Sequence, residues 1–330
     1  MRIASCLICV TLVTAALPIS TAFAQIYHVK EMNTEQIRAL NREKTVVLLP
    51  GCILEQHGPY LPSFADGYMS ERLTQQLADA IVARPGWTAL VFPLIPLGNG
   101  GANFIGQKYS FAGNYNVRFT TLRVIFMDLA TELGEQGFRW VFVVHHHGAP
   151  AHHRALDQAG DYFHDLYGGQ MVNLVGLAMP VLREVEQEVL TEEQREEDGA
   201  SVHAGTSETS RILFLRPDLV SSAIKGAPSL TGRSWDDLVR MASQKDWPGY
   251  FGAPRLASAA LGARIWERYS SAVVDLALKI LDGFDYHEMP RHGNALKGVA
   301  AYDAVEEAAL EHERSIEGKQ QEWLREKGLE

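Results

Sequence analysis

The chain has 330 residues, of which 46% are apolar, so it is long enough to bury a core of its own in one domain or in two. Its formal net charge at neutral pH is −10, which excludes binding to a nucleic-acid backbone as a main function. Beyond the first 25 residues, no run reaches the roughly 18 apolar residues that a membrane-spanning helix needs.

The first predicted element is a secretory signal peptide at residues 1–24. Arg2 precedes an apolar run that is broken by Pro18 and followed by AFA, the small-x-small pattern of a cleavage site ending at Ala24. The proline and the small residues disfavour the alternative, a permanent membrane anchor. After cleavage Cys52 would be the one remaining cysteine, so we expect a periplasmic or secreted protein without an internal disulfide.

From residue 45 to residue 180, apolar runs alternate with helical patterns. Strands are predicted at 45–51, 89–98, 139–148 and 171–180. Helices are predicted at 69–83, 119–137 and 153–169. This alternation predicts an α/β fold of three layers, with helices on both faces of a mostly parallel sheet. Ligands of such sheets bind beyond the carboxyl ends of the strands, where the connecting loops converge.

Two charged segments follow in the second half of the chain. Residues 184–199 are strongly acidic and predict an exposed helix or insertion, although their position before residue 201 also allows a lid over a site. Residues 255–284 predict a long helix that packs on the sheet. We expect a single domain over 25–330, in which 286–330 form a charged helical extension that packs on its own domain or on a neighbouring subunit.

Glu55, His57 and Asp66 follow the first predicted strand within LEQHGPYLPSFAD. Two carboxylates and an imidazole offer the mixed oxygen and nitrogen ligands of Zn²⁺, Mn²⁺ or Fe²⁺. In an extended segment Glu55 and His57 would point to one side, and Gly58 with its neighbouring prolines predicts a turn that returns Asp66. The alternative is a polar loop in solvent, because Glu-x-His triplets are common.

Five histidines surround the end of the third predicted strand. His145, His146 and His147 end the strand, and His152 and His153 open the next helix. Strand alternation puts His145 and His147 on one face and His146 on the other, so all three enter one site only if the chain bends. A histidine at a strand end suits a metal ligand. For His152 and His153 we expect a surface position or a contact behind the ligands.

The segment HAGTSETS contains His203 and Glu208. In one interpretation Thr206 or Ser207 caps a helix, and Glu208 lies in the first turn, where a carboxylate suits the helix dipole. In the other, His203 and Glu208 are acid and base groups beside a metal. The local sequence alone favours the first interpretation, a helix cap.

Together these segments resemble the creatininase family of metal-dependent amide hydrolases. PGCILEQHGPYLPSFAD is similar to the family's Pro-x-Gly-x-x-Glu-Gln-His-Gly-x-x-Leu-Pro with an Asp nine residues after the His, and HAGTSETS to His-Ala-Gly-x-x-Glu-Thr-Ser. FAGNYNVRFTTL, GFRWVFVVHHHG and GYFGAPRLASAALGARI support the resemblance. The motifs keep one order from about residue 35 to residue 285, and the resemblance implies a creatininase-like fold.

Carried over position by position, the resemblance implies two divalent ions that share Asp66. Glu55 and His147 would bind one ion, and His57 the other. The ions would activate a water molecule and polarise the scissile carbonyl group. We expect the bound metal to be Zn²⁺, with Mn²⁺ or Fe²⁺ as alternatives.

His203 would be the proton shuttle of this site, and Glu208 would orient the shuttle, the water or a metal. Ala149 stands where creatininase has a glutamate ligand of the second ion, so Glu208 or an extra histidine would fill the place, or the site would hold one ion. Ser207 stands, with Thr206, where creatininase has bulkier residues, which argues against creatinine as the substrate. Four residues are further candidate substrate contacts: His145, His146, Tyr60 and Ser207.

We therefore expect an exported amidohydrolase that cleaves the C–N bond of a small cyclic amide or a peptide-like substrate with a metal-activated water. One alternative is a peptidase-like member that acts on a short peptide. Another is a periplasmic metal-binding or ligand-binding protein that keeps the fold without turnover, and a third is a non-hydrolytic iron enzyme. The expected partners are the substrate and further copies of the chain in a homo-oligomer, with neither nucleic acid nor membrane after signal cleavage.

Overall fold

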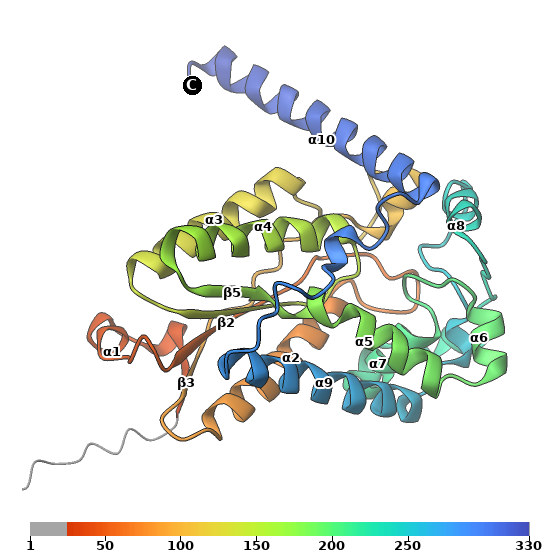
Figure 1. The fold of residues 1–330 in the computed structure, drawn as a ribbon. Helices are drawn as coiled ribbons and strands as arrows, with labels where there is room; N and C mark the ends of the chain where they lie inside the picture. Colours follow the sequence, from red (N-terminus) through yellow and green to blue (C-terminus); the bar gives the residue numbers. More distant parts are fainter. Residues whose placement is uncertain (1–24, 330) are drawn as a thin grey trace, which may run out of the picture.

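The computed structural model describes residues 25–329 of the chain (Figure 1). The predicted signal peptide therefore lies outside the described residues. Among residues 25–329, no helix has both the length and the apolar composition needed to cross a membrane.

A five-stranded sheet lies at the centre of the fold, with its strands in the order β1-β3-β2-β4-β5. The strands are β1 (Ile26–His28), β2 (Thr45–Gly51), β3 (Thr88–Val91), β4 (Trp140–His145) and β5 (Gln170–Asn173). Every neighbouring pair is parallel, so the predicted parallel sheet is confirmed. All seven residues of β2 are buried, as expected for a strand covered on both faces.

Helices cover both faces of this sheet, as the alternating pattern predicts (Figure 1). The helices on one face are α2 (Ala65–Val82), α5 (Leu174–Val189) and α9 (Ala259–Leu281), and those on the other are α3 (Phe119–Glu135) and α4 (Pro150–Tyr167). Successive residues of β2 alternate between the layers: Val46 and Leu48 join the first apolar cluster, and Val47 and Leu49 join the second.

The loops that follow β2 and β4 separate at the carboxyl end of the sheet. These strands are neighbours, with Gly51 opposite His145, but β2 leads to α2 on one face and β4 leads to α4 on the other. A crevice forms where neighbouring strands send their loops to opposite faces. The motifs after β2 and β4 therefore meet at the place where ligands of parallel sheets bind.

Two predicted strands differ from the observed ones. The strand predicted at 171–180 ends at Asn173, whose side-chain Oδ1 accepts a hydrogen bond of 3.2 Å from Gly176 N and so caps α5. The rest of that apolar run is helical and buried against the sheet. The strand predicted at 89–98 covers only residues 88–91, and residues 92–101 form an irregular loop at the carboxyl end of the sheet.

The remaining helices are α1 (Thr34–Arg38), α6 (Glu192–Asp198), α7 (Thr206–Leu215), α8 (Trp235–Ala242) and α10 (Ala300–Lys327). The acidic segment 184–199 forms the end of α5 and all of α6. The first half of α10 packs on its own chain, while its second half projects from the body of the fold (Figure 1). From residue 314 to residue 329 its side chains are exposed or half-buried.

Candidate metal centre

The six residues carried over from the motif resemblance lie at the carboxyl end of the sheet. Three of them belong to the segment after β2: Glu55 and His57 lie in the loop, and Asp66 lies in the first turn of α2. His147 lies just beyond β4. The remaining two lie at the start of α7, with His203 before the helix and Glu208 in its first turn.

These residues form three overlapping groups whose potential ligand atoms lie within 4.8 Å of one another. The groups are Glu55-Asp66-His147, His57-Asp66-Glu208 and Glu55-His57-His203. The first two share Asp66, which is the arrangement that the resemblance implies for two ions. Glu208 joins the second group, so a carboxylate is present there although Ala149 cannot supply one.

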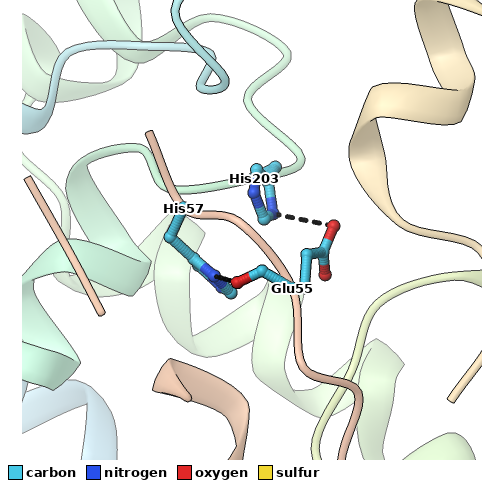
Figure 2. Close-up of side chains that lie close together, drawn as sticks. All are labelled: Glu55, His57 and His203. Carbon is cyan, nitrogen blue, oxygen red and sulfur yellow. Dashed lines mark hydrogen bonds and ion pairs between the residues drawn. The ribbon is translucent and has the colours of Figure 1, made fainter. Parts of the chain in front are cut away.

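Each of the three histidines donates one ring N–H to a backbone carbonyl oxygen. His57 Nδ1 lies 2.9 Å from Glu55 O, and His147 Nε2 lies 3.1 Å from Asn99 O. His203 Nε2 lies 2.6 Å from Gln56 O. A carbonyl oxygen can only accept, so these contacts fix which nitrogen carries the proton and turn the other nitrogen toward the carboxylates. Figure 2 shows His57 and His203 around Glu55, which follows β2.

The carboxylate of Glu55 lies at the centre of the cluster and is 1% exposed. Its Oε1 accepts from Ala102 N at 2.5 Å, and its Oε2 lies 3.1 Å from His147 Nδ1. Burial would raise the pKa of Glu55, but the positive charges of His203 and His147 outweigh burial and lower it to about 2. Glu55 is therefore an anion at neutral pH.

The carboxylates of Asp66 and Glu208 both lie near His57 Nε2. His57 Nε2 lies 3.8 Å from Asp66 Oδ1 and 3.7 Å from Glu208 Oε1. Burial raises the pKa of Asp66, and hydrogen bonding to His147 only partly offsets that effect. Burial would also raise the pKa of Glu208, but the charges of His57 and His203 hold it well below its usual range.

The donor set fits a divalent metal ion. His57 Nε2 is buried and, among residues 25–329, has no hydrogen-bond partner, although three carboxylates lie near it. Within the same range no lysine or arginine forms an ion pair with these carboxylates. Buried charges of this kind are normally paired or bound to metal, and carboxylate with imidazole is the ligand chemistry of Zn²⁺, Mn²⁺ and Fe²⁺. Glu55, His57 and Asp66 are at most 3% exposed, so the alternative of a polar loop in solvent is wrong.

Metal binding should release protons from this cluster. Burial would lower the pKa of both histidines, but the nearby carboxylates raise it to about 9 for His57 and about 10 for His147. Both rings therefore carry the extra proton at pH 7 without metal, and a ligand nitrogen must lose it. We expect Zn²⁺ binding at pH 7 to release one to two protons from these rings, and the Zn²⁺ affinity to rise with pH up to about 9.

Calorimetric titration of metal-free protein with Zn²⁺, in two buffers of different ionisation enthalpy, measures this proton release. The control is the same titration of His147→Ala at pH 7, where less proton release is expected because one of the two rings is absent. A binding enthalpy that is independent of the buffer at pH 7 would contradict the protonated state of His57 and His147 in the metal-free protein.

The start of α7 combines the two interpretations of HAGTSETS. Glu208 lies in the first helical turn, and its Oε2 accepts a 2.6 Å hydrogen bond from Ala204 N while its Oε1 faces His57. Ala204 has a left-handed backbone with φ of 52°, which is strained for a residue with a Cβ. Gly205 takes the N-cap position with no side-chain cap, so neither Thr206 nor Ser207 is the cap.

The four candidate substrate contacts divide into two pairs. His146 and Ser207 line the cavity beside the cluster. His145 does not line it: its fully buried ring lies over Gly51, where a Cβ would come within 1.8 Å of His145 Nε2. Tyr60 packs on Tyr250 at a ring separation of 5.7 Å, away from the cavity lining. The structure therefore gives His145 and Tyr60 packing roles.

The histidines around β4 keep the predicted alternation. The rings of His145 and His147 both pack on His152 of α4, at 5.4 and 5.1 Å, whereas the His146 ring lies 5.7 Å from Tyr269 of α9 on the other face of the sheet. His146 and His147 both line the cavity. His152 and His153 are fully buried, which excludes the surface position. His153 Nε2 donates to His147 O at 2.6 Å, and the His152 ring packs edge-on against His147 at 5.1 Å.

The cluster opens into a cavity of about 420 Å³. Its other walls come from α5, α6, α7 and the first half of α10. Several polar residues of the lining were missed in the sequence, among them Asn99, Glu186 and Arg211. Glu186 belongs to the acidic segment and accepts a hydrogen bond from Ser207, so part of that segment is a wall of the cavity. Asn99 had a detectable signal, since it lies in a glycine-flanked loop after a predicted strand.

Comparison with known protein families gives a match over most of the chain. The family described as "Creatininase: Creatinine amidohydrolase" matches residues 30–277. Among curated proteins, the chain is 25% identical over 250 residues to the mycofactocin precursor peptide peptidase of Mycolicibacterium smegmatis (strain ATCC 700084 / mc(2)155). That alignment covers 74% of this chain and 89% of the peptidase.

Solved structures with the same fold include a creatinine amidohydrolase (creatininase). It superposes with a TM-score of 0.58 at 21% identity, covering 78% of this chain and 98% of the other. A structure named "Creatininase Mn" gives a TM-score of 0.55, and a creatininase variant described as "Zn-Zn type" gives 0.56. Both are 20% identical to this chain, with coverage of 77% of this chain and 98% of theirs. This likeness shows the fold.

Proposed function

The chain belongs to the creatininase family of hydrolases, and on that premise we propose that it is a metal-dependent amidohydrolase. The proposed reaction is hydrolysis of a C–N amide bond in a small cyclic amide or a short peptide-like substrate. The observation that carries the proposal is the pair of buried ligand groups that share Asp66. When bound there, divalent ions would supply Lewis-acid chemistry, which acidifies water and polarises a carbonyl group.

We propose that His203 moves protons in this reaction. Its Nε2 is held by Gln56 O, while its Nδ1 lies 3.7 Å from Glu55 Oε1 and 3.9 Å from Glu208 Oε2. As water attacks the carbonyl carbon, Nδ1 would accept a proton from that water. When the C–N bond breaks, Nδ1 would return the proton to the leaving nitrogen.

Glu208, in the first turn of α7, orients His203 for this proton transfer. Its Oε2 accepts a hydrogen bond from the backbone N–H of Ala204, the residue that follows His203, so this contact holds the carboxylate next to the shuttle. The same oxygen lies 3.9 Å from His203 Nδ1, the nitrogen that would carry the moving proton. A protein that only stores metal needs neither feature, which favours the enzyme over the binding protein without turnover.

The size and walls of the cavity limit the substrate. A volume of about 420 Å³ suits a small molecule or one end of a peptide. One relative is named for a peptide substrate and another for creatinine, so both small amides and short peptides are consistent with the family. Ser207 donates a hydrogen bond to Glu186 beside the cluster, and Arg211 lies 4.0 Å from the same carboxylate, so this wall is polar and carries groups of both charge signs.

We also propose that the protein is exported, with cleavage after Ala24, and that it acts as a homo-oligomer. The support for export is the pattern of residues 1–24, which lie outside the described residues. Export favours breakdown of an environmental compound over a biosynthetic role inside the cell.

A hydrolysis screen tests the proposed function. Metal-free protein would be supplied separately with Zn²⁺, Mn²⁺ and Fe²⁺ and offered lactams, cyclic imides, hydantoins and short peptide amides. We expect release of the carboxylate and amine products from at least one class, dependent on added metal and abolished by a chelator. Tight metal binding without hydrolysis of any class would instead support the binding protein without turnover.

A further inference from the structure

The helix α10 contributes to the cavity although it lies outside the matched family segment, which ends at residue 277. Its first half forms one wall of the cavity. The residues that line this wall are Tyr302, Val305, Glu306, Ala309, Leu310 and Glu313. Arg154 of α4 pairs with Glu306, and the ring of Tyr302 packs against Trp235, so this half of the helix is fixed to the body.

Glu313 is the one buried acidic side chain of α10 and is 8% exposed. Its Oε1 accepts a 2.6 Å hydrogen bond from Asn99 Nδ2, and its Oε2 accepts a 2.8 Å hydrogen bond from Phe119 N. Phe119 is the first residue of α3, whose N-cap residue Arg118 offers no side-chain cap. The Glu313 carboxylate therefore caps α3 and holds Asn99 at the same time.

Asn99 connects this contact to the candidate metal centre. Its backbone oxygen accepts the Nε2–H of His147 at 3.1 Å, which leaves His147 Nδ1 directed at the carboxylates. Its backbone N–H donates to His152 Nδ1 at 3.3 Å. The segment 92–101 that carries Asn99 has neither helix nor strand, and isolated backbone bridges hold it at Ile95 and Gly98. Asn99 itself is held by side-chain contacts, in which its Nδ2 donates to Glu313 and, at 2.8 Å, to Val117 O.

We propose that Glu313 is a positioning residue of the candidate metal centre: it fixes the loop that carries Asn99, and the Asn99 carbonyl fixes the ring of His147. Hydrogen bonds behind a ligand histidine set its tautomer and its orientation. A segment outside the matched family region thus completes the site in this chain. This inference rests on the proposed function, because it takes His147 as a metal ligand.

The test is a double-mutant cycle on Zn²⁺ affinity, measured by competition with a chelator. Glu313→Ala removes one anchor of Asn99, and Asn99→Ala removes the amide that Glu313 holds but keeps the backbone carbonyl. We expect each single variant to weaken Zn²⁺ binding about 10-fold. We expect the loss in the double variant to be clearly smaller than the sum of the two single losses, because both changes break the contact between Asn99 and Glu313.

Glu313→Gln separates this role from a general effect on folding. Its amide oxygen can still accept from Asn99 Nδ2, although it loses the charge and one acceptor at Phe119 N. We therefore expect an affinity between those of the wild type and Glu313→Ala. The matched control is Glu317→Ala, one turn further along α10, which removes the ion pair with Arg118 and should leave Zn²⁺ affinity unchanged.

Circular dichroism and the thermal midpoint of each metal-free variant establish that it is folded. Wild-type Zn²⁺ affinity in folded Glu313→Ala would overturn the positioning role, and so would additive losses in the double variant. If Glu313→Ala does not fold, wild-type Zn²⁺ affinity in folded Asn99→Ala, which lacks the amide that Glu313 holds, would overturn it. Absence of Zn²⁺ binding by the wild type would instead remove the proposed function itself.

Discussion

Asp66→Asn is expected to remove most of the metal from the purified protein. Asp66 belongs to both ligand groups that the resemblance implies, with Oδ2 at 3.1 Å from His147 Nδ1 and Oδ1 at 3.8 Å from His57 Nε2. Asparagine keeps the shape of the side chain but loses the charge and one acceptor. Replacing a partner behind a ligand costs about 10- to 100-fold in affinity, so loss of a shared ligand should cost at least about 100-fold.

The measurement is elemental analysis of protein purified without added metal, combined with chelator competition for Zn²⁺. Asp157→Asn is the matched control, because Asp157 is a partly buried carboxylate of α4 that accepts from Asn173 Nδ2 away from the cluster. The control should keep the metal content of the wild type. Equal metal content in Asp66→Asn and the wild type would show that Asp66 is not a ligand.

His203→Ala is expected to keep the metal and to lose about 10²- to 10⁴-fold in kcat, the range typical of general acid and base catalysis. The two shared-carboxylate groups do not contain His203, so both ligand sets survive the change. The loss should appear in kcat with little change in KM, because the imidazole acts on the moving proton. The measurement is steady-state kinetics on the substrate that the hydrolysis screen identifies, with metal content determined on the same sample.

His287→Ala is the matched control for this change. His287 is a partly exposed histidine that pairs with Asp285 outside the cavity lining, so activity and metal content should both stay at the wild-type level. If His203→Ala loses metal in proportion to activity, His203 is a ligand, as the group of Glu55, His57 and His203 allows. Full activity with full metal would contradict the proton-transfer role.

Most of the fold follows from local sequence patterns, and the exceptions have a physical cause. Runs such as 46–50 are apolar throughout, as strands covered on both faces must be. The run 174–180 is also apolar throughout, and periodicity cannot distinguish a buried strand from a buried helix in so short a run. Asn173 caps α5 and so favours a helix over a strand in this run. The cap is recognisable only in the structure, where the Asn173 side chain accepts a hydrogen bond from Gly176 N.

The candidate ligands could be predicted because they lie in motifs that follow the same order as in the family. The residues that hold these ligands in position could not be predicted. His147 is recognisable at a strand end, whereas its partner Asn99 acts through a backbone oxygen that every residue type possesses. Glu313 and Asn99 are 214 positions apart in the sequence, although their side chains are in contact. The sequence of the helix that carries Glu313 predicts only a charged amphipathic extension. The apolar positions of α10 predict a packed face, but they do not reveal which acidic residue enters the site.

The most direct test of the account is anomalous diffraction at the zinc edge from crystals grown with Zn²⁺. We predict two peaks that flank the Asp66 carboxylate, one beside Glu55 and His147 and the other beside His57 and Glu208. Absence of any peak within this cluster, in crystals whose solution contains excess Zn²⁺, would contradict the proposed metal centre.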